Sequence, residues 1–415
     1  MSVPHSVKDR VWFQNEHFQN VFLLLNADGG EARVAGGAVR NSLMGHDVAD
    51  VDIATTLLPQ DVIERAETAG MKAIPTGIEH GTITIVHKGA TFEVTTLRED
   101  IETDGRHAEV RFGTDWQKDA DRRDLTINGL YADLNGDVID LVGGLDDIES
   151  ANVRFIGNAE HRIKEDYLRV LRFFRFFAQY GKGRPDAEGL KASARAVSKL
   201  SQLSAERIWK EMRLLFGAND PSRALLWMRT TGVLTAIFPE TEKWGIDSIG
   251  PLVETQSAME WDNDPLLVLE SIIPPDPDRI VEMAGRLKMS GAERSRLKHW
   301  AETPKIAHDM AETALDRQIY RGSHSGIKDV LKLSLVSARS RAEADDAAMI
   351  ESAGFSKLLK RADNWSEPAF PVSGKDLIAL GIDVGKEMGA KLKELEEHWI
   401  DSNFNLTKSD LLEKL

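Results

Sequence analysis

The chain has 415 residues, 42% of them apolar and 29% charged, which is the composition of ordinary globular domains and a length sufficient for two or more of them. No apolar run approaches the roughly eighteen residues of a membrane helix, and the charged N-terminus lacks the apolar stretch of a signal peptide, so we expect neither. The absence of cysteine excludes disulfides and thiolate metal sites, and a cytoplasmic location is expected.

The net charge of −15 is unevenly distributed along the sequence. Residues 151–215 contain fourteen Lys and Arg against seven Asp and Glu, so this segment carries +7 and the remainder −22. An acidic protein is not expected to bind nucleic acid over its whole surface. A locally basic segment is a candidate for contacting phosphates, and a solvated basic helix face is the alternative interpretation.

The first 140 residues predict a mixed α/β domain. Short β-branched runs indicate strands, a helix is predicted at 59–69, and turn residues at 87–90 and 135–136 favour hairpins. The polar stretch from Arg98 to Gly113 is predicted to be a connection between strands. The predicted strands are 33–35, 51–53, 82–86, 91–95, 130–134 and 138–139.

From about Glu160 onward the β-branched alternation disappears and apolar residues recur at helical spacing, as at Leu168, Leu171 and Phe174. The sequence therefore predicts an α/β head followed by an all-α C-terminal region. The expected domains are a catalytic head (1–150), a helical neck for base recognition (151–220), and a helical body and tail (221–415).

Two glycines and two aspartates occur close together in the predicted head. Gly36 and Gly37 lie at a turn from strand to helix, where backbone amides can approach a phosphate closely. Asp50 and Asp52 are two residues apart on the next predicted strand, so both carboxylates are expected on one face. Such oxygen ligands suit Mg²⁺, and two ions about 4 Å apart can clamp an in-line phosphoryl displacement. A solvated strand edge is the alternative for the two aspartates.

This combination resembles the signature of the polymerase-β-type nucleotidyltransferase superfamily. The resemblance implies that Asp50 and Asp52 are catalytic and hold two Mg²⁺ ions. A later strand often supplies a third carboxylate in that superfamily, and Glu93 in FEVTTLRED is the candidate here. A structural salt bridge is the alternative role for Glu93.

Three further motifs narrow the resemblance. RRDLTINGL (122–130), DLVGGLDDI (140–148) and RFIGNAEHRIKEDYLRVLRFFRF (154–176) follow the aspartates in this order. Together they resemble the class II CCA-adding enzymes and the related bacterial poly(A) polymerases. Asn41 departs from the family, which often has Asp there, and RRDLTINGL replaces the common RRDFTINAL. Neither departure affects the metal-binding pair.

Asp166 and Arg169 lie three residues apart on a predicted helix, so their side chains are expected to be neighbours. A carboxylate accepts a hydrogen bond from an amino group, and a guanidinium donates one to a ring nitrogen. Cytosine and adenine present an amino group and a ring nitrogen in the same order along the base edge, whereas guanine and uracil present donor and acceptor in the inverted order. The resemblance assigns base selection to these positions. They would admit CTP and ATP, because a wrong base leaves buried polar groups unpaired. An exposed ion pair is the alternative.

The resemblance implies roles for further polar residues. Arg40 is expected near the triphosphate or metal, and Arg122 and Arg123 near the sugar or phosphates. Nucleotide, RNA and solvent are all open as partners of Arg172 and Arg175. Phe173, Phe174, Phe176 and Phe177 are expected to pack in the core rather than stack on bases. The expected nucleotide-binding residues are Gly36, Gly37, Arg40, Arg122, Arg123, Asp124, Asn128, Asp166, Arg169 and Arg172.

Smaller features favour complete CCA addition over poly(A) synthesis. The stretch TGIEHGTITI (76–85) resembles CCA-adding enzymes, and the aspartates are not followed by the basic, aromatic segment usual in bacterial poly(A) polymerases. The predicted function is template-independent addition of CCA to tRNA 3′ ends from CTP and ATP, with the helical region holding the tRNA by shape and backbone. A poly(A) polymerase and a catalytically inactive RNA-binding protein are the alternatives, and the oligomeric state is left open.

Overall fold

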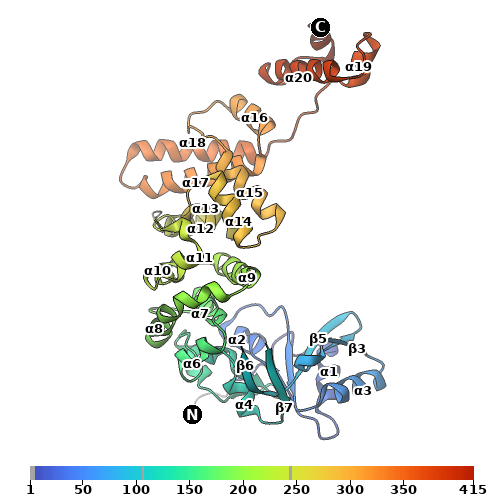
Figure 1. Cartoon of the computed structure of the whole chain (residues 1–415), viewed down its shortest axis with the longest axis vertical. Coiled ribbons are helices and arrows are strands. Elements are labelled where there is room, and N and C mark those ends of the chain that lie inside the picture. The colour runs from blue at the N-terminus through green and yellow to red at the C-terminus, as the bar shows by residue number, and fades with distance from the viewer. Residues whose placement is uncertain (1–4, 105–106, 243–244) are drawn as a thin grey trace. The chain divides into compact units, whose positions relative to one another are not determined.

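The computed structural model describes residues 5–104, 107–242 and 245–415. Within them the predicted fold class is confirmed, because a mixed sheet with helices precedes an all-helical region (Figure 1). The chain divides into two compact units, residues 1–237 and 238–415. The division at residues 150 and 220 stays a prediction. The described strands are β1 (Ala32–Ala35), β2 (Asp52–Thr55), β3 (Lys72–Gly77), β4 (Thr82–His87), β5 (Ala90–Thr96), β6 (Arg98–Asp104), β7 (His107–Phe112), β8 (Leu130–Ala132) and β9 (Val138–Asp140).

Seven strands form one mixed sheet in the order β3-β4-β5-β2-β1-β8-β9. β2 and β5 run parallel, and the other neighbouring strands are antiparallel. All six strands predicted from the sequence are confirmed. β3 was not predicted, since KAIPTG contains a proline and lacks apolar alternation. It lies at the edge of the sheet, where proline is tolerated because one side of the strand has no ladder to complete.

The stretch that the sequence predicted only as a connection between strands contains a β-hairpin of its own, formed by β6 and β7. β6 and β7 pair with each other as a separate two-stranded sheet. The hairpin was missed because charged residues occupy many positions of REDIETDGRHAEVRF, and an apolar alternation is therefore not visible in the sequence. Gly105 and Arg106, at the centre of this stretch, lie outside the described residues.

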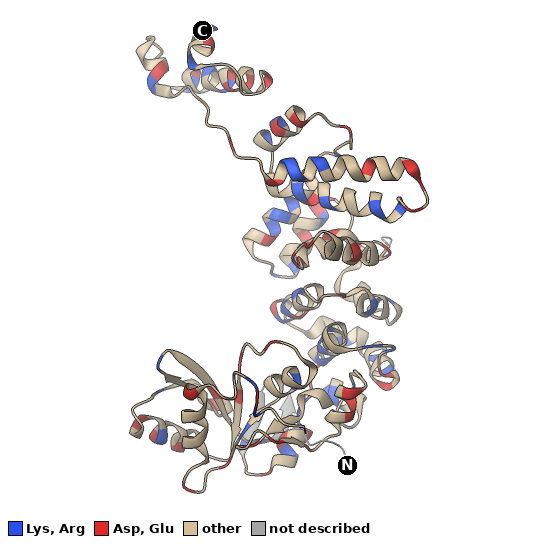
Figure 2. Cartoon of the chain, turned by 180° about the vertical axis from the view of Figure 1, so that it is seen from behind, with Lys and Arg blue, Asp and Glu red and all other residues tan. Residues whose placement is uncertain are grey.

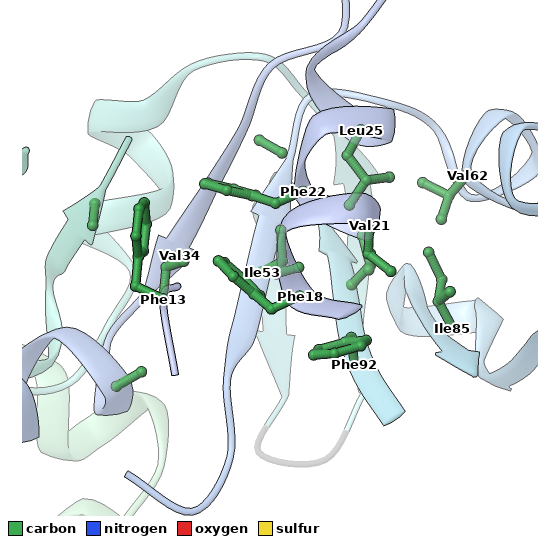
Figure 3. Close-up of a cluster of buried hydrophobic side chains, with 14 of the residues drawn as sticks. Phe13, Phe18, Val21, Phe22, Leu25, Val34, Ile53, Val62, Ile85 and Phe92 are labelled. Atoms are coloured by element: carbon green, nitrogen blue, oxygen red, sulfur yellow. The ribbon is translucent and has the colours of Figure 1, made fainter. Parts of the chain in front are cut away.

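One face of the seven-stranded sheet is covered by α1 and α3. Phe18 and Phe22 of α1 stack with ring centroids 5.0 Å apart and lie in one buried cluster with Ile53 of β2 (Figure 3). Val62 of α3 and Ile85 of β4 belong to the same cluster. Burying these large side chains supplies the main stabilisation of the head, at about 1.5–3 kcal/mol for each fully buried one.

The opposite face of the sheet carries two of the three predicted catalytic residues, Asp52 and Glu93. Ala35 and Ala54, the chain neighbours of residues in the α1 cluster, pack instead with Trp116 of α4. Side chains alternate along a strand, so Asp52 shares the face of Ala54. Asp52 is paired in register with Glu93 of β5, which therefore lies on this same face.

The remaining regular elements are helices. The four phenylalanines of α7 that were predicted to pack in the core are all buried, which confirms this prediction. They are Phe173, Phe174, Phe176 and Phe177. Among the described residues, no helix is both long and apolar enough to cross a membrane. The helices of the first unit are α1 (Glu16–Asn26), α2 (Gly37–Met44), α3 (Pro59–Thr68), α4 (Trp116–Asp121), α5 (Gly144–Glu149), α6 (Ala159–Glu165), α7 (Leu168–Tyr180), α8 (Ala187–Ala196), α9 (Ala205–Phe216), α10 (Ser222–Thr230) and α11 (Val233–Ile237). Those of the second unit are α12 (Ile249–Ala258), α13 (Pro265–Ile272), α14 (Pro277–Arg286), α15 (Gly291–Glu302), α16 (Glu312–Arg321), α17 (His324–Arg341), α18 (Asp346–Asp363), α19 (Gly374–Ala379), α20 (Lys386–Asp401) and α21 (Lys408–Leu412).

A buried ion pair joins α7 to α9. Nε of Arg175 donates to Oε2 of Glu211 at 2.6 Å, and both side chains are buried. The guanidinium also lies 4.2 Å from the ring centroid of Phe176. Of the partners left open for Arg175, solvent is therefore excluded, and the residue ties two helices of the first unit together.

Replacing Glu211 by Ala is expected to lower the free energy of unfolding by about 3–5 kcal/mol, because it leaves a buried guanidinium without its partner. Urea unfolding followed by circular dichroism measures the change. Lys210→Ala, at an exposed position of the same helix, is the control and should cost less than about 0.5 kcal/mol. Equal effects of the two substitutions would contradict a stabilising role for the pair.

Candidate nucleotide-binding site

A pocket of about 440 Å³ in the first unit contains most of the residues predicted for the site. Eleven of the thirteen predicted site residues line it, and Asp50 and Glu93 are the two that do not. The predicted residues in the lining are Gly36, Gly37, Arg40, Asp52, Arg122, Arg123, Asp124, Asn128, Asp166, Arg169 and Arg172. The lining residues not predicted are Ala35, Leu168, Phe176 and Arg207.

Gly36 forms the turn from β1 into α2. Its φ is 65°, and its N–H donates to the carbonyl oxygen of Leu130 at 2.8 Å. A Cβ at this position would lie 3.2 Å from both Nη1 of Arg123 and the carbonyl oxygen of Asn128. At Gly37 an added Cβ would meet only Nη2 of Arg40, at an ordinary 3.8 Å. The backbone conformation and the neighbouring atoms therefore require glycine at position 36 but not at position 37.

Gly36→Ala is expected to lower the free energy of unfolding by about 1–3 kcal/mol, because alanine is strained at this positive φ. It should also reduce nucleotide binding, because the added Cβ displaces Arg123 and Asn128 in the pocket wall. Gly37→Ala is the matched control, and it should be neutral or stabilising by up to about 1 kcal/mol. Thermal unfolding and CTP binding of both variants test this. Two equally tolerated substitutions would contradict the assignment to Gly36.

Asp50 does not share a strand with Asp52, so this part of the prediction is wrong. β2 begins at Asp52, two residues later, and β1 on its one side has already turned into α2 at Gly36. The two carboxylates nevertheless interact. Desolvation raises the pKa of Asp52, and the charges of Glu93 and Asp50 raise it further, against a smaller opposite effect of Arg123.

A cation would relieve this repulsion between carboxylates. No three His, Asp or Glu side chains of the described residues are placed to enclose a metal ion. Mg²⁺ is commonly bound by one or two carboxylates, with water and substrate phosphates completing its coordination. The pair Asp50 and Asp52 therefore fits a substrate-bridged Mg²⁺ site better than a closed structural one.

Arg122 and Arg123 are held by a single buried aspartate that was not predicted. Asp119 of α4 accepts from Arg122 at 2.6 Å, from Arg123 at 3.0 Å and from the Tyr131 hydroxyl at 2.7 Å. Burial alone would raise the pKa of Asp119, but Arg123 and Arg122 outweigh it and keep that pKa below its usual value. The spacing of three and four residues between Asp119 and the arginines was the available signal.

A second chain of hydrogen bonds crosses the pocket from α7 to α2. Nε of Arg172 donates to Oδ2 of Asp124 at 2.6 Å, and Nδ2 of Asn128 donates to Oδ1 of the same aspartate at 3.1 Å. Nη1 of Arg40 donates to Oδ1 of Asn128, and its Nη2 donates to the Tyr180 hydroxyl at 2.9 Å. These contacts fix the polar wall of the pocket before any ligand binds.

Asp166 and Arg169 both line the pocket, but the prediction that they share one helix is wrong. α6 ends at Glu165, and Asp166 has an extended backbone; its Oδ1 accepts from the N–H of Leu168 at 3.0 Å. Aspartate is favoured at such helix starts, which explains the break between α6 and α7. Oδ2 of Asp166 accepts from Arg207 at 2.5 Å, whereas Arg169 donates to Glu165. Nothing in the sequence signals Arg207, which is 41 residues away.

The basic segment 151–215 has fewer free charges than its composition suggests. At least nine of its fourteen Lys and Arg side chains form ion pairs with acids of the same unit. Figure 2 shows the acidic positions interspersed among the basic ones on these helices. Two of these acids, Asp124 and Asp147, lie outside the segment, so the positive charge available to external phosphates is smaller than +7.

The fold and the pocket define a nucleotidyltransferase. Residues 32–154 match the family described as "Poly A polymerase head domain", and residues 185–244 match "Probable RNA and SrmB- binding site of polymerase A". The chain is 36% identical to "CCA tRNA nucleotidyltransferase 1, mitochondrial" of Danio rerio over 93% of this chain and 87% of that protein. It is 34% identical to the Homo sapiens protein of the same name, over 96% and 91% of the two chains. The crystal structure of the Bacillus stearothermophilus CCA-adding enzyme in complex with CTP matches with a TM-score of 0.69 at 25% identity, covering 93% and 92%.

The chain belongs to the CCA tRNA nucleotidyltransferase family. The resemblance found in the sequence is thereby confirmed. Enzymes with this nucleotidyltransferase fold generally use divalent metal ions.

Proposed function

We propose that this protein adds the sequence CCA to the 3′ ends of tRNA, using CTP and ATP without a nucleic-acid template. The observation that carries this conclusion is the identity of 34–36% to CCA tRNA nucleotidyltransferases over 93–96% of the chain. Poly(A) synthesis and a purely RNA-binding role are not favoured. The conclusion is also consistent with the pocket, whose wall presents six arginines that can donate to a triphosphate.

In the proposed reaction the tRNA 3′-hydroxyl oxygen attacks the α-phosphorus of the bound nucleotide, and pyrophosphate leaves in line with it. Arg40, Arg122 and Arg123 bind the phosphates and stabilise the charge that develops on them. The start of α2 at Gly36 contributes backbone amides and a positive helix end.

Asp50 and Asp52 would hold two Mg²⁺ ions, with Glu93 as a further carboxylate close by. When bound, the metal activates the attacking hydroxyl and neutralises charge on the triphosphate. The residues around this pair then act by orientation: the networks of Asp119 and Asp124 keep the arginines in place, so that little reorganisation is needed when the nucleotide enters.

Base selection is proposed for Asp166 and Arg169. The amino group of cytosine or adenine would donate to the carboxylate, and the guanidinium would donate to the adjacent ring nitrogen. Arg207 and Glu165 hold these two side chains at the pocket wall, and thereby position them for a base edge. A single pair can serve both nucleotides because cytosine and adenine present the same order of donor and acceptor.

The helical region is proposed to hold the tRNA. The cytoplasmic location stays a prediction, since the names of the vertebrate relatives specify mitochondria.

The function is tested with the purified protein, Mg²⁺ and a tRNA transcript that lacks its last three nucleotides. With both nucleotides we expect extension by three residues, with CTP alone extension by two, and with ATP alone none. Long A tracts would identify a poly(A) polymerase, and no extension under any condition would support the inactive RNA-binding alternative.

A further inference from the structure

The six arginines that line the nucleotide pocket differ in whether a carboxylate neutralises them. Five of them form an ion pair with an aspartate or glutamate of the same unit. Arg40 is the sixth, and among the side chains that the structure describes no carboxylate forms an ion pair with it. Within this described part of the pocket, Arg40 therefore carries a positive charge that has no direct counter-charge. The paired arginines are Arg122, Arg123, Arg169, Arg172 and Arg207.

The hydrogen bonds that Arg40 makes to described side chains all go to neutral groups. Its Nε donates to Oδ1 of Asn41 at 3.1 Å, and its Nη2 donates to the same oxygen at 2.8 Å and to the Tyr180 hydroxyl at 2.9 Å. Its Nη1 donates to Oδ1 of Asn128. A guanidinium has five N–H groups, so these four bonds fix its orientation and leave one N–H of Nη1 for a ligand.

Asn41 supplies a neutral acceptor at a place where a carboxylate would also fit. Its Oδ1 accepts from Arg40 and, at 3.1 Å, from the Tyr180 hydroxyl, whereas its Nδ2 donates to the carbonyl oxygen of Asp47 at 2.8 Å. An aspartate has nearly the same size and would keep the acceptor for Arg40, but it would add a negative charge beside the guanidinium. Asn41 does not line the pocket itself, so its effect on a bound nucleotide is transmitted by Arg40.

The electrostatic state of Arg40 differs from that of a paired arginine in the same pocket. Arg40 is 7% exposed, and burial lowers its pKa against the opposing effect of Tyr180, with Asp124 contributing least. Burial also acts on Arg172, but there the ion pair with Asp124 outweighs it and raises the pKa. A buried guanidinium without a counter-charge is unfavourable, and a phosphate bound beside it would supply that counter-charge.

We infer that Asn41 is a positioning residue that sets the affinity of the pocket for the triphosphate, because its neutral amide orients Arg40 without neutralising it. The inference rests on the proposed function, in which Arg40 binds the phosphates. Its consequence is a charge-dependent contribution to nucleotide binding that is the same for every base. Base selection belongs to other side chains of the pocket, so a change at Asn41 alters affinity and leaves the ratio between CTP and UTP unchanged.

The test measures CTP binding to the full-length protein by isothermal titration calorimetry, with Mg²⁺ and without tRNA. Asn41→Asp is expected to bind CTP about fivefold more weakly at low ionic strength, because a neutralised guanidinium forms a weaker bond to phosphate. The wild-type affinity should also fall more steeply with added NaCl than that of the variant, since only the charge-dependent part is screened. Asn135→Asp makes the same substitution at an exposed position outside the pocket, and this control should bind as the wild type does.

Asn41→Ser removes the amide contacts without adding a charge, and it separates the two effects. It should lose less CTP affinity than Asn41→Asp and keep the salt dependence of the wild type, which tests the inference even where the aspartate variant fails to fold. Circular dichroism establishes the folding of each variant. Equal CTP affinity of wild type and a folded Asn41→Asp, an equal loss in Asn41→Ser, or a shallower salt dependence in Asn41→Ser would overturn the inference. None of these results affects tRNA extension by the wild type, whereas a wild type that neither binds CTP nor extends tRNA would remove the proposed function and this inference with it.

Discussion

Asp52→Asn is expected to lower the rate of nucleotide incorporation at least about a thousandfold. The variant loses a proposed metal ligand but keeps the size of the side chain. Asp52 opens β2 on the sheet face away from the α1 cluster, so packing does not require its carboxylate. Folding and tRNA affinity should therefore change little. Single-turnover CTP incorporation at saturating Mg²⁺ measures the effect.

Asp121→Asn is the control for this experiment. Asp121 is an exposed head residue at the end of α4, and it does not line the pocket. Its substitution should leave the rate within about twofold of wild type, since exposed substitutions away from the site change interaction energies by only a few tenths of a kcal/mol. Retained incorporation by an Asp50→Asn, Asp52→Asn double variant would refute the metal-ligand assignment.

Asp166→Ala and Arg169→Ala should each relax nucleotide choice as well as slow the reaction. Losing one partner of a buried hydrogen bond costs about 1–3 kcal/mol, so discrimination of CTP against UTP is expected to fall about 5–150-fold. The ratio of kcat/KM values for the two nucleotides is the measurement. A slower enzyme with unchanged discrimination would show that these residues only support the pocket.

Two further variants separate base reading from positioning. Arg207→Ala removes the contact that holds Asp166, and a smaller loss of discrimination is expected because the carboxylate itself remains. Arg195→Ala breaks an exposed ion pair with Glu160 in the same unit, and it should leave the nucleotide ratio unchanged. Equal loss in all four variants would indicate a general destabilisation of the helices instead.

Most of the head could be predicted because its signals are local in the chain. β-branched runs marked six strands, and a glycine at the end of β1 marked the start of α2. The hairpin of β6 and β7 and the edge strand β3 were not predicted, since neither shows apolar alternation along its sequence. The start of β2 was placed too early, because no residue type in the stretch before Asp52 marks where the ladder with β1 begins.

The sequence by itself determined the order of elements, the family resemblance and a set of candidate residues, most of which line one pocket. Those signals reside in residue types at short spacing. The tertiary structure alone decided which side chains face one another: Arg207 holds Asp166 across 41 residues, and Arg172 holds Asp124 across 48. Such pairings depend on how helices pack, and packing brings together residues whose separation in the chain carries no periodic signal.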